Sequence, residues 1–329
     1  MPKIVVFGGS GFIGTQVVAR LAAAGDRVLV PTRRRERVKH LLPLPTVELA
    51  QIDTFDSATL RRLVGGCDAV VNLVGILHGR RGVPYGADFA RAHVRLPQKL
   101  AQACIDRGVP RLVHVSAIGA DSHGPSMYLR SKGDGEAALR AADAGLRWTI
   151  FRPSVVFGEG DHFLNLFAGL QRRLPVLLLG GAEQRFAPVY VGDVAQAIAA
   201  SLHGPRASET VGRIYELGGP RVYTLGELAR LAGAAAGVCA GHGRPVLALP
   251  QGAARVLAWL MEKAPGEPLL SRDNLDSLRL PSVPGGELPG FAAELEVAHP
   301  AVLEALAPLW LRPPEAPDVR GRWRVHGGR

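Results

Sequence analysis

A glycine-rich turn near the start of the chain limits the possible folds more than any other feature. The segment Gly-Gly-Ser-Gly-Phe-Ile-Gly follows the apolar run Lys3–Phe7 and opens the amphipathic run Ile13–Ala24. A strand, a turn of this spacing and a helix form the phosphate-binding turn of dinucleotide-binding βαβ units. Gly8 allows the tight turn, Gly11 allows a pyrophosphate close to the backbone, and Gly14 allows the helix to pack on the strand. We therefore predict that backbone N–H groups of this turn bind phosphates.

The first 152 residues alternate short apolar runs with helix-like stretches. Most of the runs are nearly continuous in Val, Ile and Leu, which is typical of parallel strands covered on both faces. The pattern predicts an α/β fold with a doubly wound parallel sheet of the Rossmann type. The expected strands are Lys3–Phe7, Arg27–Pro31, Val47–Ile52, Ala69–Val74, Arg111–Ser116 and Trp148–Arg152. The expected helices are Ile13–Ala24, Ser57–Val64 (with Asp56 or Ser57 as N-cap), Gly86–Arg107 and Tyr128–Ala144.

Gly and Pro interrupt this pattern after the last expected strand. Helices are expected near His162–Arg173 and Val191–His203, and further helices with Pro-rich turns follow. They predict a smaller, mostly helical C-terminal lobe. The expected parts are a nucleotide-binding domain over residues 1–220, whose later segments are shared with the lobe, the lobe over 221–311, and a basic, disordered tail over 312–329.

The composition excludes several classes of protein. With 329 residues, 47% of them hydrophobic and 21% charged, the chain is neither fibrous nor disordered as a whole. No apolar run approaches the roughly 18 residues that span a bilayer. The three cysteines are far apart and give no metal or disulfide spacing. We therefore expect a cytoplasmic protein without a metal site.

The net charge of +10 is concentrated in two segments. Residues 33–39 carry a net charge of +4, and the tail from Arg312 carries +3. No recognised nucleic-acid-binding module accompanies them, so nucleic acid is not an expected partner. The tail is compatible with a partner protein, an anionic membrane surface or no partner at all.

The residues after the second expected strand indicate the type of nucleotide. An acidic residue about 20 positions after the first glycine binds the ribose hydroxyls of NAD in this fold. Here Thr32 is followed by Arg33, Arg34 and Arg35, with no carboxylate at that place. Guanidinium groups bind a 2′-phosphate in bidentate fashion, which favours NADP(H) over NAD(H). The alternative is that these arginines only face water.

Several further motifs follow the glycine turn in a fixed order along residues 1–220. They are Asp53 in Gln-Ile-Asp-Thr, Asn72-Leu-Val-Gly, Tyr128-x-x-x-Lys132, Arg152-Pro-Ser-Val-Val-Phe-Gly and Pro188-Val-Tyr-Val-Gly-Asp-Val-Ala. This series resembles the extended and atypical branches of the short-chain dehydrogenase/reductase superfamily, the NAD-dependent epimerase/dehydratase-like proteins.

Three stretches resemble a narrower branch of that superfamily. Ser116–Asp121, Tyr128–Glu136 and Pro265–Asn274 are similar to the branch that contains the NAD(P)H-binding accessory subunit of respiratory complex I and its bacterial relatives. That branch includes a protein linked to ubiquinone biosynthesis. The resemblance implies a tightly held nucleotide and leaves catalysis open.

The motifs and the resemblance together predict the nucleotide-binding residues. They are Gly8, Gly11, Phe12, Ile13, Gly14, Thr32, Arg33, Arg34, Asp53, Thr54, Val74, Gly75, Ser116, Tyr128, Lys132, Pro153 and Val155.

Tyr128 and Lys132 are the candidate catalytic residues. At positions i and i+4 they share a helix face, and an ammonium beside a phenol lowers the phenol pKa toward neutrality. The superfamily usually adds a Ser or Thr hydroxyl, but Ile118 occupies its position here. Losing one such donor costs on the order of 10²–10³ in rate.

Other side chains are weaker candidates. Asp161, His162 and Arg185 lie in Gly-rich or Pro-rich segments where they face either a substrate or solvent. His78 and the neighbouring arginines Arg80 and Arg81 follow the fourth strand, where substrates often enter such folds.

The segment Ala253–Lys263 is amphipathic, with the apolar residues Val256, Leu257, Trp259, Leu260 and Met261. Such a helix either packs within the lobe or contacts a membrane, a quinone or a partner subunit.

Two functions remain open. One is a nucleotide-binding subunit, or an assembly or quinone-related factor, similar to the complex I accessory subunit and located in the cytoplasm or at the inner face of the membrane. The other is an active NADP(H)-dependent oxidoreductase or epimerase that acts on a carbonyl, alcohol or quinone substrate through Tyr128 and Lys132.

Overall fold

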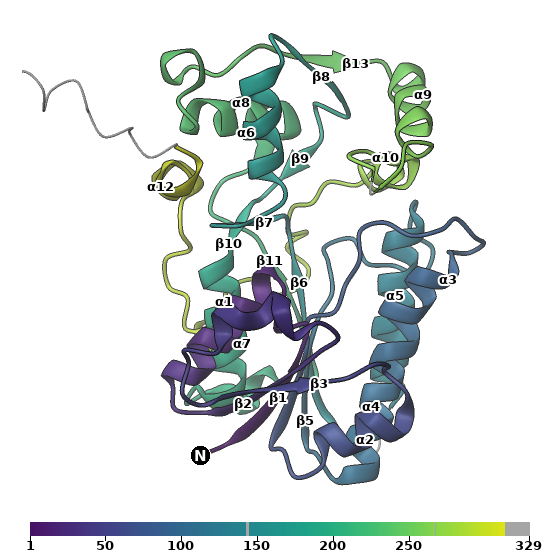
Figure 1. Ribbon diagram of the computed structural model, residues 1–329, viewed down its shortest axis with the longest axis vertical. Coiled ribbons are helices and arrows are strands. Elements are labelled where there is room, and N and C mark those ends of the chain that lie inside the picture. Colours follow the sequence, from purple (N-terminus) through teal and green to yellow (C-terminus); the bar gives the residue numbers. More distant parts are fainter. Residues whose placement is uncertain (143–144, 267, 313–329) are drawn as a thin grey trace, which may run out of the picture.

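The computed structural model describes residues 1–142, 145–266 and 268–312 (Figure 1). Apart from Arg312, the expected basic tail therefore lies outside the described residues. No helix within those ranges is both long and apolar enough to cross a membrane.

A seven-stranded parallel sheet confirms the expected α/β class. Its strand order is β11-β6-β5-β4-β1-β2-β3, so the chain starts near the middle and winds outward in both directions. The strands are β1 (Lys3–Phe7), β2 (Arg27–Thr32), β3 (Val47–Gln51), β4 (Ala69–Asn72), β5 (Arg111–Val115), β6 (Arg147–Pro153) and β11 (Arg213–Leu217). Because all seven are parallel, their carboxyl ends meet at one edge.

Helices cover both faces of the sheet. Alternate strand residues point to opposite faces, so Val5 packs with α2 and α4 while its neighbours Ile4 and Val6 pack with α1 and α7. Figure 1 shows α1 and α7 on one side and α2, α4 and α5 on the other. The helices are α1 (Phe12–Ala23), α2 (Ser57–Val64), α4 (Leu96–Arg107), α5 (Met127–Arg140) and α7 (Val191–His203), with short 3₁₀ turns η1 (Arg35–Leu41) and η3 (Ala207–Thr210).

The expected helix Gly86–Arg107 has a change of winding in its middle. It consists of α3 (Ala87–Phe89), a π-helical segment η2 (Ala90–Arg95) and then α4. Pro97 lies in the first turn of α4 and cannot donate a backbone hydrogen bond. The wider winding before it accommodates the missing bond, and such segments are frequent at functional sites.

The second lobe uses residues from both sides of the expected boundary at 220. Its core joins Phe157, Leu164 and Phe167 to Leu228 and Leu303. Its elements are β7 (Val156–Phe157), α6 (Leu164–Arg173), β8 (Leu177–Gly180), β9 (Arg185–Phe186), β10 (Val189–Tyr190), β12 (Tyr223–Thr224), α8 (Leu225–Ala235), η4 (Val238–Gly241), β13 (Val246–Leu249), α9 (Gln251–Met261), α10 (Arg272–Ser277), α11 (Leu303–Leu306) and α12 (Pro308–Leu311). The short turn η5 (Ala293–Leu295) belongs to the sheet domain, where Leu295 packs in the core with α7. The second lobe lies beyond the carboxyl edge of the sheet (Figure 1).

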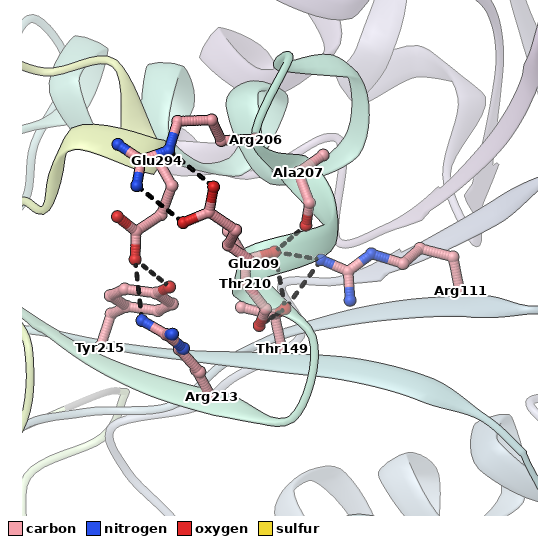
Figure 2. A network of polar contacts seen from close by, with 9 residues as sticks. All are labelled: Arg111, Thr149, Arg206, Ala207, Glu209, Thr210, Arg213, Tyr215 and Glu294. Atoms are coloured by element: carbon pink, nitrogen blue, oxygen red, sulfur yellow. Dashed lines mark hydrogen bonds and ion pairs between the residues drawn. The ribbon is translucent and has the colours of Figure 1, made fainter.

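A buried arginine joins several elements at the opposite edge of the sheet. Arg111 begins β5 and donates to the Thr149 and Thr210 hydroxyls at 2.7 and 2.8 Å (Figure 2). It also donates to the Ser201 carbonyl at 2.9 Å. Burial lowers its pKa to about 10, so it stays charged at neutral pH. These bonds tie β5, β6, α7 and η3 together.

Candidate functional site

The glycine turn lies at the carboxyl edge of the sheet, and its glycines leave no room for side chains. A Cβ atom on Gly14 would lie 2.1 Å from the Gly8 carbonyl oxygen. Gly8 has a φ of +79°, and a Cβ there would lie 2.9 Å from the Leu73 backbone. The first turn of α1 can therefore pack against β1 and β4 only if these residues are glycine.

The first turn of α1 leaves its positive end open. Its N-cap is the exposed Gly11, no side chain caps it, and the turn contains no acidic residue. Phe12 and Ile13 follow, each partly exposed. This arrangement fits a bound phosphate, because free N–H groups and the helix dipole both favour an anion.

The end of β2 presents arginines to solvent. The Thr32 hydroxyl accepts a hydrogen bond from the Arg34 N–H at 3.2 Å and shapes the loop. Arg33 and Arg34 are exposed, and within the described residues neither forms an ion pair. Glu36 pairs with Lys39 instead.

The end of β3 carries a second group of polar residues. Asp53 and Thr54 are both exposed. The Thr54 hydroxyl donates to Asp56 at 2.6 Å, and Asp56 accepts from the Thr59 N–H, which confirms Asp56 as the N-cap of α2. Hydrogen bonds from Thr54 and Thr59 hold the pKa of Asp56 well below its usual range.

The loop after β4 lies beside the expected ribose-binding lysine. A Cβ on Gly75 would lie 3.4 Å from the Lys132 Nζ atom. The preceding residue, Val74, is partly buried, and its N–H donates to the Asn72 side chain at 3.2 Å. The expected residues Val74, Gly75 and Lys132 therefore come together.

Tyr128 and Lys132 lie on α5 as expected, but the prediction that Lys132 lowers the phenol pKa is wrong for this structure. Burial raises the pKa of Tyr128 to about 12 and lowers that of Lys132 to about 8. The Lys132 amine donates to the Val115 carbonyl at 3.1 Å. The phenol therefore keeps its proton at neutral pH.

Ser116 directly follows β5, its side chain is buried, and its Oγ atom has no hydrogen-bond partner among the described residues. A buried hydroxyl without a partner is rare and suits a ligand or a water molecule. Ile118 is also buried, and its N–H donates to the Pro153 carbonyl at 3.2 Å. The Val155 carbonyl accepts from the Val189 N–H, which fixes the segment after β6.

His93, in the π-helical segment, was not predicted from the sequence. Its Nε2 accepts the Ile76 N–H at 3.0 Å, so its Nδ1 carries the proton and donates to the Ser131 hydroxyl at 2.8 Å. The imidazole ring meets the Tyr128 ring edge-on at 5.5 Å. His93 thus joins the loop after β4 to the helix that carries Tyr128.

A second buried histidine lies on β5. The Nδ1 atom of His114 pairs with the Asn72 amide at 3.1 Å, and its Nε2 has no partner among the described residues. Burial lowers the pKa of His93 to about 2 and that of His114 to about 3, so both are neutral.

The second lobe caps the helix that carries Tyr128. The buried Asp273 of α10 accepts the N–H groups of Met127 at 2.7 Å and Tyr128 at 3.1 Å. The Ser277 hydroxyl donates to Ser126, the N-cap residue of α5, at 2.8 Å. No sequence pattern indicated this contact, because 146 residues separate Met127 from Asp273.

A cavity of about 440 Å³ adjoins this contact. The expected loop residues His78, Arg80 and Arg81 line one wall. The other walls are Leu77, Gly79, Phe89, Met127, Glu262, Gly266, Pro268, Ser271 and Asp273. Since the Phe89 ring lies 6.4 Å from the Tyr128 ring, the cavity is next to the candidate catalytic helix.

The weaker candidates Asp161 and Arg185 lie in the second lobe. Asp161 is buried and accepts the N–H groups of Gly158 and Leu164, which fixes the start of α6. Arg185 is exposed on the short strand β9. Within the described ranges, no three His, Cys, Asp or Glu residues are grouped as metal ligands.

Comparisons with known proteins agree with this arrangement. Residues 4–218 match the model of the NAD dependent epimerase/dehydratase family. The chain is 35% identical over 232 residues to subunit 9 of the 1 alpha subcomplex of mitochondrial NADH dehydrogenase (ubiquinone) from Arabidopsis thaliana, covering 69% of this chain and 56% of that protein. It is 31% identical over 296 residues to the protein of the same name from Rattus norvegicus, covering 87% and 74%. The chain thus spans little more than half the length of its plant relative.

The solved structures agree on the fold. A nucleoside-diphosphate-sugar epimerase from Staphylococcus aureus superposes with a TM-score of 0.69 over 94% of this chain and 100% of that chain, at 17% identity. The parallel sheet, the glycine turn and the family match place this chain in the NAD-dependent epimerase/dehydratase family, whose members bind a nicotinamide dinucleotide.

Proposed function

We propose that this protein is a nicotinamide-dinucleotide-binding subunit or assembly factor of a respiratory or quinone-related complex, and that it works in the cytoplasm at the inner face of the membrane. One observation supports the proposal most: the glycine turn leaves the start of α1 uncapped, which suits a bound phosphate, whereas the Lys132 amine is bonded to the Val115 carbonyl. A high phenol pKa and Ile118 at the expected hydroxyl position further disfavour catalysis. The mitochondrial relatives, named as subunits of NADH dehydrogenase, support the choice of partner.

We propose that Gly8, Gly11, Phe12, Ile13 and Gly14 hold the pyrophosphate through backbone N–H groups. Thr32, Arg33 and Arg34 then hold the adenosine 2′-phosphate of NADP(H). The remaining contacts are made by residues at or after the other strand ends and on α5. They are Asp53, Thr54, Val74, Gly75, Ser116, Tyr128, Lys132, Pro153 and Val155.

The choice of nucleotide is tested at Arg33. Arg33→Asp removes a guanidinium and adds a repelling charge, so NADP(H) affinity falls at least about tenfold while NAD(H) affinity changes little. Isothermal titration with both nucleotides measures this difference. The exposed Arg62 on α2 forms no ion pair among the described residues, so Arg62→Asp is a matched control. Equal loss for both nucleotides contradicts the 2′-phosphate role.

The position of Tyr128 beside the cavity favours a second function, an NADP(H)-dependent oxidoreductase or epimerase for a carbonyl, alcohol or quinone substrate. The purified full chain, with its bound nucleotide identified by mass spectrometry, is tested against carbonyl and quinone panels by absorbance of the reduced cofactor. Turnover that Tyr128→Phe abolishes establishes the enzyme and refutes a purely structural role. Bound nucleotide without turnover supports the subunit.

A further inference from the structure

Helix α9 exposes three large apolar side chains on one face and buries two alanines on the other. Ala254 and Ala258 are 1% and 0% exposed, whereas Val256, Trp259 and Leu260 are 60%, 45% and 54% exposed. The inner face is in close contact with β8, because a Cβ on Gly180 would lie 2.5 Å from the Ala254 Cβ atom. The helix therefore cannot rotate its larger side chains inward without a clash.

The exposed side chains form a stripe along the helix. Val256, Trp259, Leu260 and Lys263 follow the i, i+3, i+4, i+7 spacing of one helix face. The Lys263 ammonium lies 5.9 Å from the centre of the Trp259 ring, at the border of the stripe. An exposed apolar stripe of this kind indicates a binding surface rather than a stable solvent face.

The C-terminal end of α9 adjoins the 440 Å³ cavity, because Glu262, the residue directly after α9, lines it. Leu77, which also lines the cavity, is 58% exposed, and Leu269 is 57% exposed beside the lining residue Pro268. Exposed leucines from two loops thus lie at or next to the cavity that adjoins α9.

The charged side chains beside α9 and the cavity favour an anionic partner. Neither Lys263 nor Arg81 has a carboxylate within ion-pair distance among the described residues. Glu262, the acid beside Lys263 in the sequence, is paired with Arg272 at 2.7 Å, which neutralises its charge. Cationic groups beside a tryptophan and exposed aliphatic side chains suit the boundary between lipid headgroups and acyl chains.

We propose that the stripe of α9, together with the loops around Leu77 and Leu269, docks on an anionic phospholipid surface, with the cavity opening toward the lipid. This inference rests on the proposed function and names its lipid partner. A ligand that enters the cavity in this orientation comes from the membrane, so it is an amphipathic compound.

Co-sedimentation of the full chain with vesicles tests the proposal. We expect binding to phosphatidylcholine vesicles that contain phosphatidylglycerol, and weaker binding to phosphatidylcholine alone. The double variant Trp259→Ser with Leu260→Ser loses about tenfold or more of its vesicle affinity, because two large apolar side chains no longer enter the lipid. Lys263→Glu weakens only the binding to anionic vesicles.

The matched control replaces exposed leucines elsewhere, Leu42→Ser with Leu309→Ser, and keeps vesicle binding. Nucleotide titration and thermal melting of each variant show that it is folded, and they separate failure of lipid docking from failure of nucleotide binding. The proposal is overturned if the native chain does not bind vesicles, or if the α9 double variant binds them as tightly as the native chain does. It is also overturned if sedimentation shows a dimer that the α9 variant abolishes, because the occupant is then a second copy.

Discussion

Single residues at the carboxyl edge of the sheet determine whether a nucleotide can be held. The tightest place is Gly14, where even a methyl group has no space beside the Gly8 carbonyl. The glycine spacing predicted this requirement, because the steric reason for each glycine is local to the turn.

Gly14→Ala should weaken nucleotide binding by about tenfold or more and lower stability, because its Cβ would lie 2.1 Å from the Gly8 oxygen. Fluorescence titration with the reduced nucleotide measures the loss. Gly169→Ala, in α6 with nothing within 4 Å of its added Cβ, is the control and should bind normally. Unchanged affinity in Gly14→Ala would contradict the proposed pyrophosphate position.

The two buried histidines make the fold sensitive to mild acid. Their folded pKa values of about 2 and about 3 lie below the ordinary 6.5, because burial disfavours the charged ring. As the pH falls from 6.5 to 5.5, the unfolded chain binds protons that the folded chain does not. The free energy of unfolding should therefore fall by about 2 kcal/mol for His93 and His114 together.

Urea unfolding at both pH values measures this loss. His114→Gln should remove about half of it, whatever the variant's own stability. An identical pH dependence in His114→Gln would show that this histidine is not held neutral.

At the scale of elements, the start of α5 depends on α10. Asp273→Ala leaves two N–H groups of α5 without their acceptor, and we expect the free energy of unfolding to fall by about 2 kcal/mol. Urea denaturation measures the change. Asp276→Ala, in the same short helix, removes ion pairs with the partly exposed Arg255 and Arg279 and should cost less than about 1 kcal/mol. Equal losses would mean that Asp273 is not a cap.

The sequence predicted six of the seven sheet strands, with errors of at most two residues at their ends, because apolar runs and glycine turns are local signals. It missed β11, whose run Arg213–Leu217 mixes charged and apolar residues at the sheet edge. It also missed His93 and Asp273, since their roles depend on packing between distant segments. The prediction of a lowered Tyr128 pKa was wrong because the spacing of Tyr128 and Lys132 does not show how deeply the phenol is buried.

At the scale of the whole molecule, the two lobes share their interiors. Phe157, Leu164 and Phe167 pack into the core of the second lobe, and Leu295, near the C-terminus, packs into a core of the sheet. The boundary predicted at residue 220 therefore does not separate the two hydrophobic cores, because each core contains residues from both sides of it.

A chain ending at residue 220 should not unfold cooperatively, because it lacks the partners of Phe157 and Phe167 and exposes both. Differential scanning calorimetry compares it with the full chain. A sharp transition in the shortened chain, near the temperature of the full one, would instead establish residues 1–220 as a domain that folds alone.

The contact between Asp273 and α5 also affects the order of events during synthesis. The glycine turn and Lys132 are synthesised early, but the carboxylate that caps the helix of Lys132 is made 146 residues after Met127. A nascent chain therefore carries the proposed nucleotide contacts up to Lys132 while the start of α5 still lacks that cap. The cap can form only after residue 273 has been synthesised.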